Sequence, residues 1–248
     1  MTASEIKKVR QLQGKKFRDE LGLFTVEGEK MVSEAVSSGF FVENIYRTEE
    51  IGEQTMRKIS SLSSPSPVLA VVRKPETIHL ESQAEIEKAM SGRGFFLALD
   101  SIRDPGNLGT ILRVADWFGA DAVFATCDTV DLFNPKVVQA TMGAVFRVKF
   151  HYVDMMTLCD AVAAQGGRIY GTFLDGEDIF AKDLDGGACH PVVVVTGNES
   201  NGISPQLATR VDSRLFIPPY PAKGSGSESL NAAVATAITV AQFTKYRH

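Results

Sequence analysis

Hydrophobic residues along the chain fall into short continuous runs that alternate with segments of helical periodicity. In the first part of the chain, apolar runs predict strands at residues 24–26, 41–46 and 68–72. The intervening residues 29–38 and 53–60 carry apolar positions at helical spacing. This order of strands and helices predicts a small α/β unit of about 75–80 residues.

From residue 94 onward the alternation continues with more strongly apolar runs. The expected strands are residues 94–99, 122–126, 145–150, 168–172, 192–195 and 214–217. The expected helices are residues 108–118, 134–144 and 154–164, a short helix from 204, and a last helix after 231. Continuous apolar runs are typical of strands buried on both faces. Repeated strand–helix units therefore predict an α/β fold with a mostly parallel sheet and helices on both faces.

A polar and charged segment, residues 74–93, separates the two series of elements. We place a linker there and predict two domains, residues 1–88 and residues 94–248. The last helix is apolar on nearly every side, so we expect it to be buried against the sheet or against a second subunit. Trp117 lies at helical spacing in an apolar stretch, and its simplest role is packing in the interior.

Composition narrows the class of protein without identifying it. The net charge of −4 over 248 residues argues against nucleic-acid binding by bulk positive charge. Three cysteines lack metal-site spacing and four histidines are scattered, so no metal site is predicted. The sequence has neither a signal-peptide core nor an apolar run of membrane-spanning length, and we therefore expect a cytoplasmic protein.

Positive charge is nevertheless concentrated near the amino terminus. Residues 7–18 are locally basic, which predicts a patch that meets RNA phosphates. The predicted phosphate contacts are Arg10, Lys15, Lys16 and Arg18. A solvated face of an amphipathic helix explains the same charges, and this alternative stays open.

Polar loops rich in glycine follow three of the predicted strands, after Leu99, Val195 and Ile217. In a parallel sheet, ligands bind beyond the carboxyl ends of the strands, so the three loops predict one binding site. The GxGxxG and GxxxxGK[ST] motifs are missing, which argues against a site for NAD or a nucleoside triphosphate.

Two charged residues near these loops have ordinary explanations as well as functional ones. Arg113 interrupts an apolar helix face, where it could pair with Asp104 or Asp116. Glu199 could equally be a turn residue in a tight loop. From composition and spacing alone, the chain is a ligand-binding α/β protein whose ligand is open.

Three motifs in these loops resemble the SpoU family of RNA ribose methyltransferases. Residues 104–119 (DPGNLGTILRVADWFG) are similar to the first motif of the family, and residues 196–202 (TGNESNG) to the second. Residues 217–218 (IP) together with 228–231 (ESLN) are similar to the third. Upstream, residues 16–30 (KFRDELGLFTVEGEK) resemble the RNA-substrate-binding domain that many members carry.

The resemblance implies a fold and partners that periodicity does not. Members of the family fold the catalytic domain as an α/β sheet with a C-terminal trefoil knot, and the amino-terminal domain is similar to ribosomal protein L30e. They act as homodimers and bind S-adenosyl-L-methionine in the knot loops. The implied activity is transfer of its methyl group to a ribose 2′-OH of RNA.

The resemblance also implies roles for particular residues. The backbone expected to hold the cofactor lies around Thr196, Gly197, Ile217 and Leu230. The side chains expected around the RNA ribose, its phosphate and the cofactor tail are Asn107, Glu199, Ser229 and Asn231. Arg113 matches the proposed catalytic residue of the family. Because a guanidinium with a pKa above ~12 rarely loses its proton, we expect Arg113 to clamp a phosphate and to stabilise the developing 2′-alkoxide.

Two features depart from the family pattern. Asn231 is followed by Ala232-Ala-Val-Ala, where the family more often has Val-Ser-Val-Ala, and the change removes one hydroxyl. The loop at residues 218–227 is longer than usual, and we expect it to act as a mobile lid over the cofactor.

The RNA substrate is the least defined part of the prediction. Ribosomal RNA is expected, because the amino-terminal extension resembles that of the members that act on ribosomes. The alternatives are a transfer RNA ribose methyltransferase and a non-catalytic RNA-binding protein with the same fold.

Overall fold

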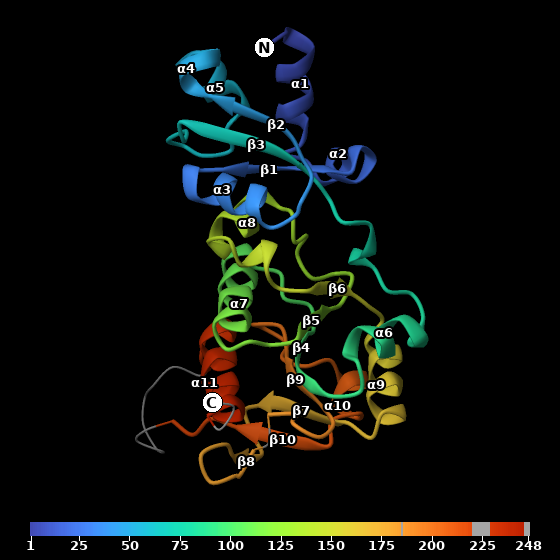
Figure 1. Ribbon diagram of the computed structural model, residues 1–248. Coiled ribbons are helices and arrows are strands. Elements are labelled where there is room, and N and C mark those ends of the chain that lie inside the picture. Colours follow the sequence, from blue (N-terminus) through green and yellow to red (C-terminus); the bar gives the residue numbers. More distant parts are fainter. Residues whose placement is uncertain (185, 220–228, 246–248) are drawn as a thin grey trace. The chain divides into compact units, whose positions relative to one another are not determined.

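The computed structural model describes residues 1–184, 186–219 and 229–245 of the chain. These form two compact units (Figure 1). The first unit consists of residues 1–76 and 130–147, and the second of residues 77–129 and 148–248. Residues 130–147 therefore pack with the amino-terminal unit although they follow the first strands of the second series in sequence. The predicted domains, 1–88 and 94–248, divide the sequence differently and stay a prediction.

The first unit is built on a three-stranded antiparallel sheet. Its strands are β1 (Leu23–Glu27), β2 (Val42–Arg47) and β3 (Val68–Arg73), in the order β1-β3-β2. Its helices are α1 (Ala3–Gln11), α2 (Lys15–Leu21), α3 (Glu29–Ser37), α4 (Thr48–Ile51), α5 (Glu53–Ile59), α8 (Pro135–Thr141) and the 3₁₀ turn η2 (Ala144–Phe146). The predicted strands and helices of the small α/β unit are confirmed, with shifts of a few residues at their ends.

One core of the first unit lies between the sheet and the helices α1 and α5. Val9 and Leu12 from the α1 region pack with Met56 of α5 and Leu69 of β3, and all four are buried. Burial of such side chains stabilises a fold by roughly 1.5–3 kcal/mol each. The position of α1, and of the basic residues on its outer face, is therefore fixed by the core beneath it.

The second unit contains a seven-stranded sheet in the order β6-β5-β4-β9-β7-β10-β8, and all of its strand pairs are parallel. The strands are β4 (Gly94–Leu99), β5 (Ala122–Ala125), β6 (Phe150–Tyr152), β7 (Arg168–Phe173), β8 (Glu177–Asp178), β9 (Pro191–Thr196) and β10 (Ser213–Phe216). The helices are η1 (Glu76–Ile78, at the junction of the units), α6 (Gln83–Met90), α7 (Pro105–Trp117), α9 (Met155–Ala164), α10 (Pro205–Ala208) and α11 (Ala232–Thr244). The predicted parallel sheet is confirmed.

Helices cover both faces of this sheet (Figure 1). The helices α6 and α9 lie on one face, and α7 and α11 on the other. Alternate residues of the central strand β4 show the division. Phe96 faces the cluster that contains Leu158 of α9, whereas the Phe95 ring lies 5.5 Å from the Phe243 ring of α11.

Two local predictions were wrong. A strand was predicted at 145–150, but Val145 and Phe146 belong to the turn η2, and β6 begins only at Phe150. Met142 and Gly143 both have positive φ angles, and the resulting sharp turn lets the Phe146 ring pack 5.2 Å from the Phe40 ring. The units divide at residues 76–77, inside the segment 74–93 where a linker or domain boundary was predicted, and the rest of that segment contains α6, which packs into the core of the second unit.

The second wrong prediction concerns Trp117. It was expected in the interior, but it is 85% exposed at the end of α7. The buried face of α7 is formed by Leu108, Ile111, Leu112 and Ala115, and Trp117 lies outside that stripe. The expected burial of α11 against the sheet is confirmed for one side of the helix, including Ala233, Val240 and Phe243.

Candidate functional site

The three polar loops lie at one edge of the second sheet. They follow β4, β9 and β10, and these strands run parallel, so their carboxyl ends point to the same edge. The loops therefore converge as the sequence predicted.

A chain of hydrogen bonds joins residues from all three motifs. Asn107 Nδ2 donates to Glu199 Oε1 at 2.6 Å, and Asn231 Nδ2 donates to Asn107 Oδ1 at 2.8 Å. Asn231 Oδ1 in turn accepts the backbone N–H groups of Ala233 and Val234, so Asn231 caps α11. The orientation of both amides is set by these partners, and the chain ends on the carboxylate of Glu199.

Asn107 is the centre of this arrangement. Its side chain is held between Glu199 and Asn231, and the residue is 9% exposed. Asp104 caps the amino terminus of α7 by accepting the backbone N–H of Asn107 at 2.8 Å. Asp104 is thus the helix cap of α7, and its role as a partner of Arg113 is not seen.

Arg113 lies on the exposed side of α7, about a turn and a half beyond Asn107. Within the part of the chain that the structure describes, its guanidinium makes neither a hydrogen bond nor an ion pair. A permanently charged group without a carboxylate partner is available to an anion from outside.

The loop that carries Glu199 is closed on itself. Asn198 and Gly202 pair through their backbones at 3.0 and 2.9 Å, and Asn198 Oδ1 accepts the N–H groups of Ser200 and Asn201. A Cβ on Gly197 would lie 2.2 Å from the backbone of Gly202. Only glycine fits at position 197, because the backbone of its own loop approaches it this closely.

The same loop is tied to the loop after β4. Asn198 Nδ2 donates to the carbonyl oxygen of Ser101 at 2.8 Å, and Asp100, which is buried, accepts the N–H of Ser204 at 2.7 Å. These contacts fix Glu199 relative to the start of α7. Sequence reasoning did not identify Asn198 as a positioning residue, although it stands inside the second motif.

The residues predicted to hold the cofactor differ in exposure. Thr196 is buried, and its hydroxyl lies 2.9 Å from that of Thr236 on α11. Thr236 donates to the carbonyl oxygen of Ala232 at 2.7 Å, so Thr196 is the donor between the two hydroxyls. Ile217 is half-buried and Leu230 is 48% exposed, which leaves apolar surface at the ends of the other two loops.

Two further predicted features have less structural support. Ser229 is exposed and takes no part in the hydrogen-bond chain among the described residues. The predicted lid spans residues 218–227, of which 220–227 lie outside the residues that the structure describes.

The predicted RNA contacts of the first unit are not equivalent. Arg10 is exposed, and Lys15 and Lys16 are exposed but face acidic residues one helical turn away, Asp19 at 2.9 Å and Glu20 at 3.8 Å. Those pairs are worth little in water, so they reduce local charge without blocking the side chains.

Arg18 is an exception to the predicted basic patch, because its side chain is 2% exposed. Its guanidinium donates to Asp131 at 2.9 and 2.7 Å and to the carbonyl oxygens of Leu12 and Gln13 at 2.8 Å. A buried charge that loses a partner is left uncompensated, which is strongly destabilising. Arg18 is therefore not available to a phosphate. The spacing of basic residues could not reveal this, since Asp131 lies 113 residues away.

Within the described ranges, no three His, Cys, Asp or Glu side chains are placed to hold a metal ion. The helices of the described residues are also too short or too polar to cross a membrane.

Comparison with known proteins matches both parts of the chain. Residues 94–241 match the SpoU rRNA Methylase family, and residues 3–74 match the MRM3-like substrate binding domain. The first match covers more than half of the chain and includes every residue of the hydrogen-bond chain.

Individual relatives extend over nearly the whole chain. It is 30% identical over 251 residues to the 23S rRNA (guanosine(2553)-2′-O)-methyltransferase RlmP of Bacillus subtilis, covering 95% of this chain and 94% of that protein. It is 29% identical to the human mitochondrial rRNA methyltransferase 3, covering 92% of this chain and 68% of that protein. The structure of an AdoMet-bound rRNA methyltransferase from Sinorhizobium meliloti superposes with a TM-score of 0.85 at 28% identity, covering 99% and 96% of the two chains.

Proposed function

Because the chain belongs to the SpoU rRNA methylase family, we propose that it transfers a methyl group from S-adenosyl-L-methionine to a ribose 2′-OH of RNA. The observation that carries the proposal is the hydrogen-bond chain from Asn231 through Asn107 to Glu199. It joins the three motifs into one polar surface, and Arg113, on the same helix as Asn107, is an unpaired cation within the described part of the chain. A protein that had kept only the fold would not need this arrangement.

The residues at the loop ends suit this cofactor. Ile217 is half-buried and Leu230 is 48% exposed, so both leave apolar surface against which a purine ring can lie. When bound, S-adenosylmethionine supplies a methyl group activated by a sulfonium centre.

The protein's own part is to bind the cofactor and the RNA, to align the reacting atoms and to stabilise the charge that develops on the 2′-oxygen. We propose that Asn107, Glu199, Ser229 and Asn231 surround the ribose, its phosphate and the methionine end of the cofactor. The fixed orientation of Asn107 and Asn231 lowers the cost of aligning the reacting atoms, because these amides do not reorganise during reaction.

Arg113 acts in this proposal as a phosphate clamp that also stabilises the negative charge on the 2′-oxygen. It stays protonated, since a guanidinium does not serve as a base near neutral pH. As the new O–CH₃ bond forms and the S–CH₃ bond breaks, the hydroxyl proton passes to a phosphate oxygen or to water.

Three further properties belong to the proposal. The catalytic domain forms a trefoil knot and the protein forms a homodimer, as the family pattern implies. Exposed apolar side chains on the packed helices α7 and α11, Trp117 at 85% and Val234 at 48%, support a second subunit there. We also place the protein in the cytoplasm, where the Bacillus subtilis relative has its 23S rRNA substrate.

Ribosomal RNA is the proposed substrate. The Bacillus subtilis and human relatives, which span most of the chain, are named for ribosomal RNA, and residues 3–74 match the MRM3-like substrate binding domain. A nucleotide outside a duplex would be presented to the site, because a paired ribose is less accessible to side chains.

The test is methyl transfer to RNA from cells that lack this protein. Purified protein with radiolabelled S-adenosylmethionine is expected to label ribosomal RNA at bonds that resist alkaline cleavage, because 2′-O-methylation blocks that reaction. Label in transfer RNA would show that transfer RNA, and not ribosomal RNA, is the substrate. Label on a base would contradict the proposal. RNA binding without any transfer would identify a non-catalytic protein.

A further inference from the structure

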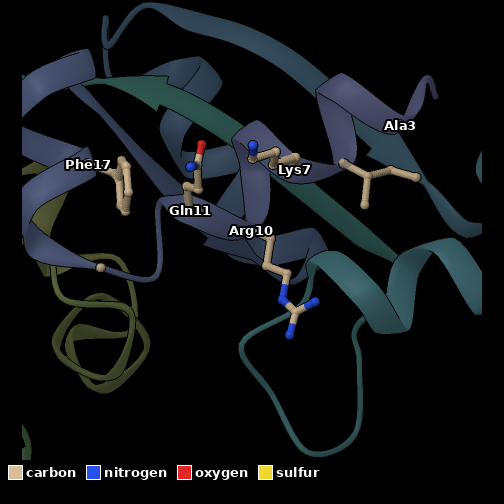
Figure 2. Close-up of a pocket in the computed structure, with 7 residues that line it drawn as sticks. Ala3, Lys7, Arg10, Gln11 and Phe17 are labelled. Carbon is tan, nitrogen blue, oxygen red and sulfur yellow. The ribbon is translucent and has the colours of Figure 1, made fainter.

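A groove of about 480 Å³ lies on the outer side of the first unit, along α1 and the start of α2 (Figure 2). It is formed by the first unit alone. Its lining residues are Ala3, Ile6, Lys7, Arg10, Gln11, Gly14 and Phe17. Its volume is within the range of roughly 300–1,000 Å³ that is usual for small-molecule sites.

The groove has an apolar part, formed by Ile6 and Phe17. Ile6 packs against the buried cluster that contains Val9 and Leu12, so its position follows from the core. Phe17 is half-buried on α2 and forms another part of the lining (Figure 2). A partly exposed aromatic ring is a surface on which a planar group can stack.

The charged part of the groove is positive and unneutralised. Lys7 and Arg10 are exposed, and neither has an acidic partner within the described residues. By contrast, Lys15 and Lys16, outside the groove, pair with Asp19 and Glu20. The lining contains no carboxylate, and Gln11 adds an amide that can both donate and accept hydrogen bonds.

We propose that this groove binds one unpaired nucleotide of the RNA substrate, with its base against Phe17 and Ile6 and its flanking phosphates at Lys7 and Arg10. Two free cations beside an apolar, partly aromatic surface complement a single RNA strand, which offers a base between two phosphates. The inference rests on the proposed function, since it takes RNA as the substrate. It adds a second point of attachment, on the first unit.

The groove also changes which basic residues of the first unit are proposed to contact RNA phosphates. The sequence predicted Arg10, Lys15, Lys16 and Arg18, of which only Arg10 lines the groove. Lys7 joins Arg10 because it lies one turn away on the same helix. The groove is expected to select an unpaired nucleotide next to an RNA helix over a nucleotide within a duplex. The aromatic side chain of Phe17 can reach a base only where that base is not stacked in a duplex.

The test compares two double variants of the full-length protein that remove equal charge. Lys7→Gln with Arg10→Gln removes the groove cations, and Arg57→Gln with Lys58→Gln, on α5 of the same unit and outside the groove, is the matched control. Affinity for single-stranded oligoadenylate and for ribosomal RNA is measured by filter binding over a series of salt concentrations. The groove variant is expected to bind both RNAs about tenfold more weakly and to lower the salt slope by about 1.4, from two phosphate contacts.

Phe17→Leu separates stacking from charge. It keeps apolar volume but removes the aromatic face, and about a tenfold loss of oligoadenylate affinity is expected, with the salt slope unchanged. Affinity for S-adenosylhomocysteine, measured by calorimetry, is expected to be unchanged in all variants. Thermal unfolding identifies any variant that is misfolded; if Phe17→Leu is, the two charge variants decide alone.

The outcomes separate this inference from the proposed function. If the groove variant loses no more RNA affinity than the control, the groove is not an RNA site, and a protein segment becomes the alternative occupant. If wild-type protein binds RNA through the groove but transfers no methyl group, the inference stands and the catalytic proposal fails.

Discussion

Arg113 and Asn107 lie on the same helix but in different surroundings. Asn107 is buried between two partners from other loops, whereas Arg113 is exposed and unpaired among the described residues. The first is therefore suited to hold a fixed geometry, and the second to meet an anion that arrives with the substrate. This difference separates a positioning role from a role in charge stabilisation.

Arg113→Lys tests the second role. A lysine keeps the charge but loses the planar pair of donors, so we expect kcat to fall about 10²-fold with cofactor affinity within a factor of two. Steady-state kinetics and calorimetry with S-adenosylhomocysteine measure the two effects. Arg210→Lys, at a surface pair with Asp160, is the control. Near-native turnover in Arg113→Lys would count against bidentate clamping.

The cysteines allow a chemical test of burial in the second unit. Burial raises the pKa of the Cys159 thiol to about 11, whereas Cys127 and Cys189 are exposed. At pH 8, Cys159 is therefore expected to resist iodoacetamide while Cys127 reacts, as read by peptide mass spectrometry. Equal labelling of Cys127 and Cys159 in the native protein would contradict the packing of α9.

The raised pKa of Cys159 also sets a pH dependence. Near pH 9 the Cys159 thiol ionises in the unfolded chain but not in the folded protein. Its contribution to the free energy of unfolding is therefore fully present below that pH. The contribution is lost as pH rises towards about 11.

At the scale of elements, the loop after β9 is held by backbone pairing together with the side chain of Asn198. Asn198 and Gly202 close the loop, and Gly197 lies so close to Gly202 that a side chain cannot fit. The loop therefore requires glycine at position 197 for its own closure, whether or not a ligand is bound. Its place in the motif reflects the shape that presents Glu199.

Gly197→Ala is expected to destabilise the protein by about 2 kcal/mol or more and to abolish methyl transfer, because the loop must open to accommodate the methyl group. Urea unfolding measures the free-energy change. Asn201→Ala in the same loop is the control, and its change is expected to stay within about 0.5 kcal/mol. Similar stabilities for the two variants would show that the loop is not closed in this way.

The helix α11 carries two tasks on different sides. Phe243 and Val240 pack towards the sheet, while Thr236 receives the hydroxyl of Thr196 and so connects the second motif to the third. Val234, on the other side, stays 48% exposed. A helix that is apolar all round thus buries one side within the chain and leaves apolar residues for a partner.

For the whole molecule, the proposed homodimer depends on that apolar surface. Trp117→Glu places a charge where the exposed indole lies, and we expect the dimer dissociation constant to rise at least 30-fold, as for a central interface aromatic. Sedimentation velocity over a concentration series measures it. Trp117→Phe is expected to remain dimeric. A wild-type protein that is monomeric at every concentration would remove the dimer from the proposal.

The sequence alone determined those properties that depend on local order. Strand and helix runs predicted the parallel sheet because periodicity reports which face of an element is buried. The motifs placed Asn107, Glu199 and Asn231 at one sheet edge, because all carboxyl ends of a parallel sheet share an edge. These steps need only neighbours along the chain.

Only the tertiary structure decided which side chains meet. The bonds of Asn107 reach 92 residues to Glu199 and 124 residues to Asn231, and Arg18 reaches 113 residues to Asp131. Residues 130–147 pack with the first unit, and Trp117 stays exposed, for the same reason. Side-chain partners at such separations depend on how whole elements pack, and no local pattern of hydrophobic and polar residues encodes that packing.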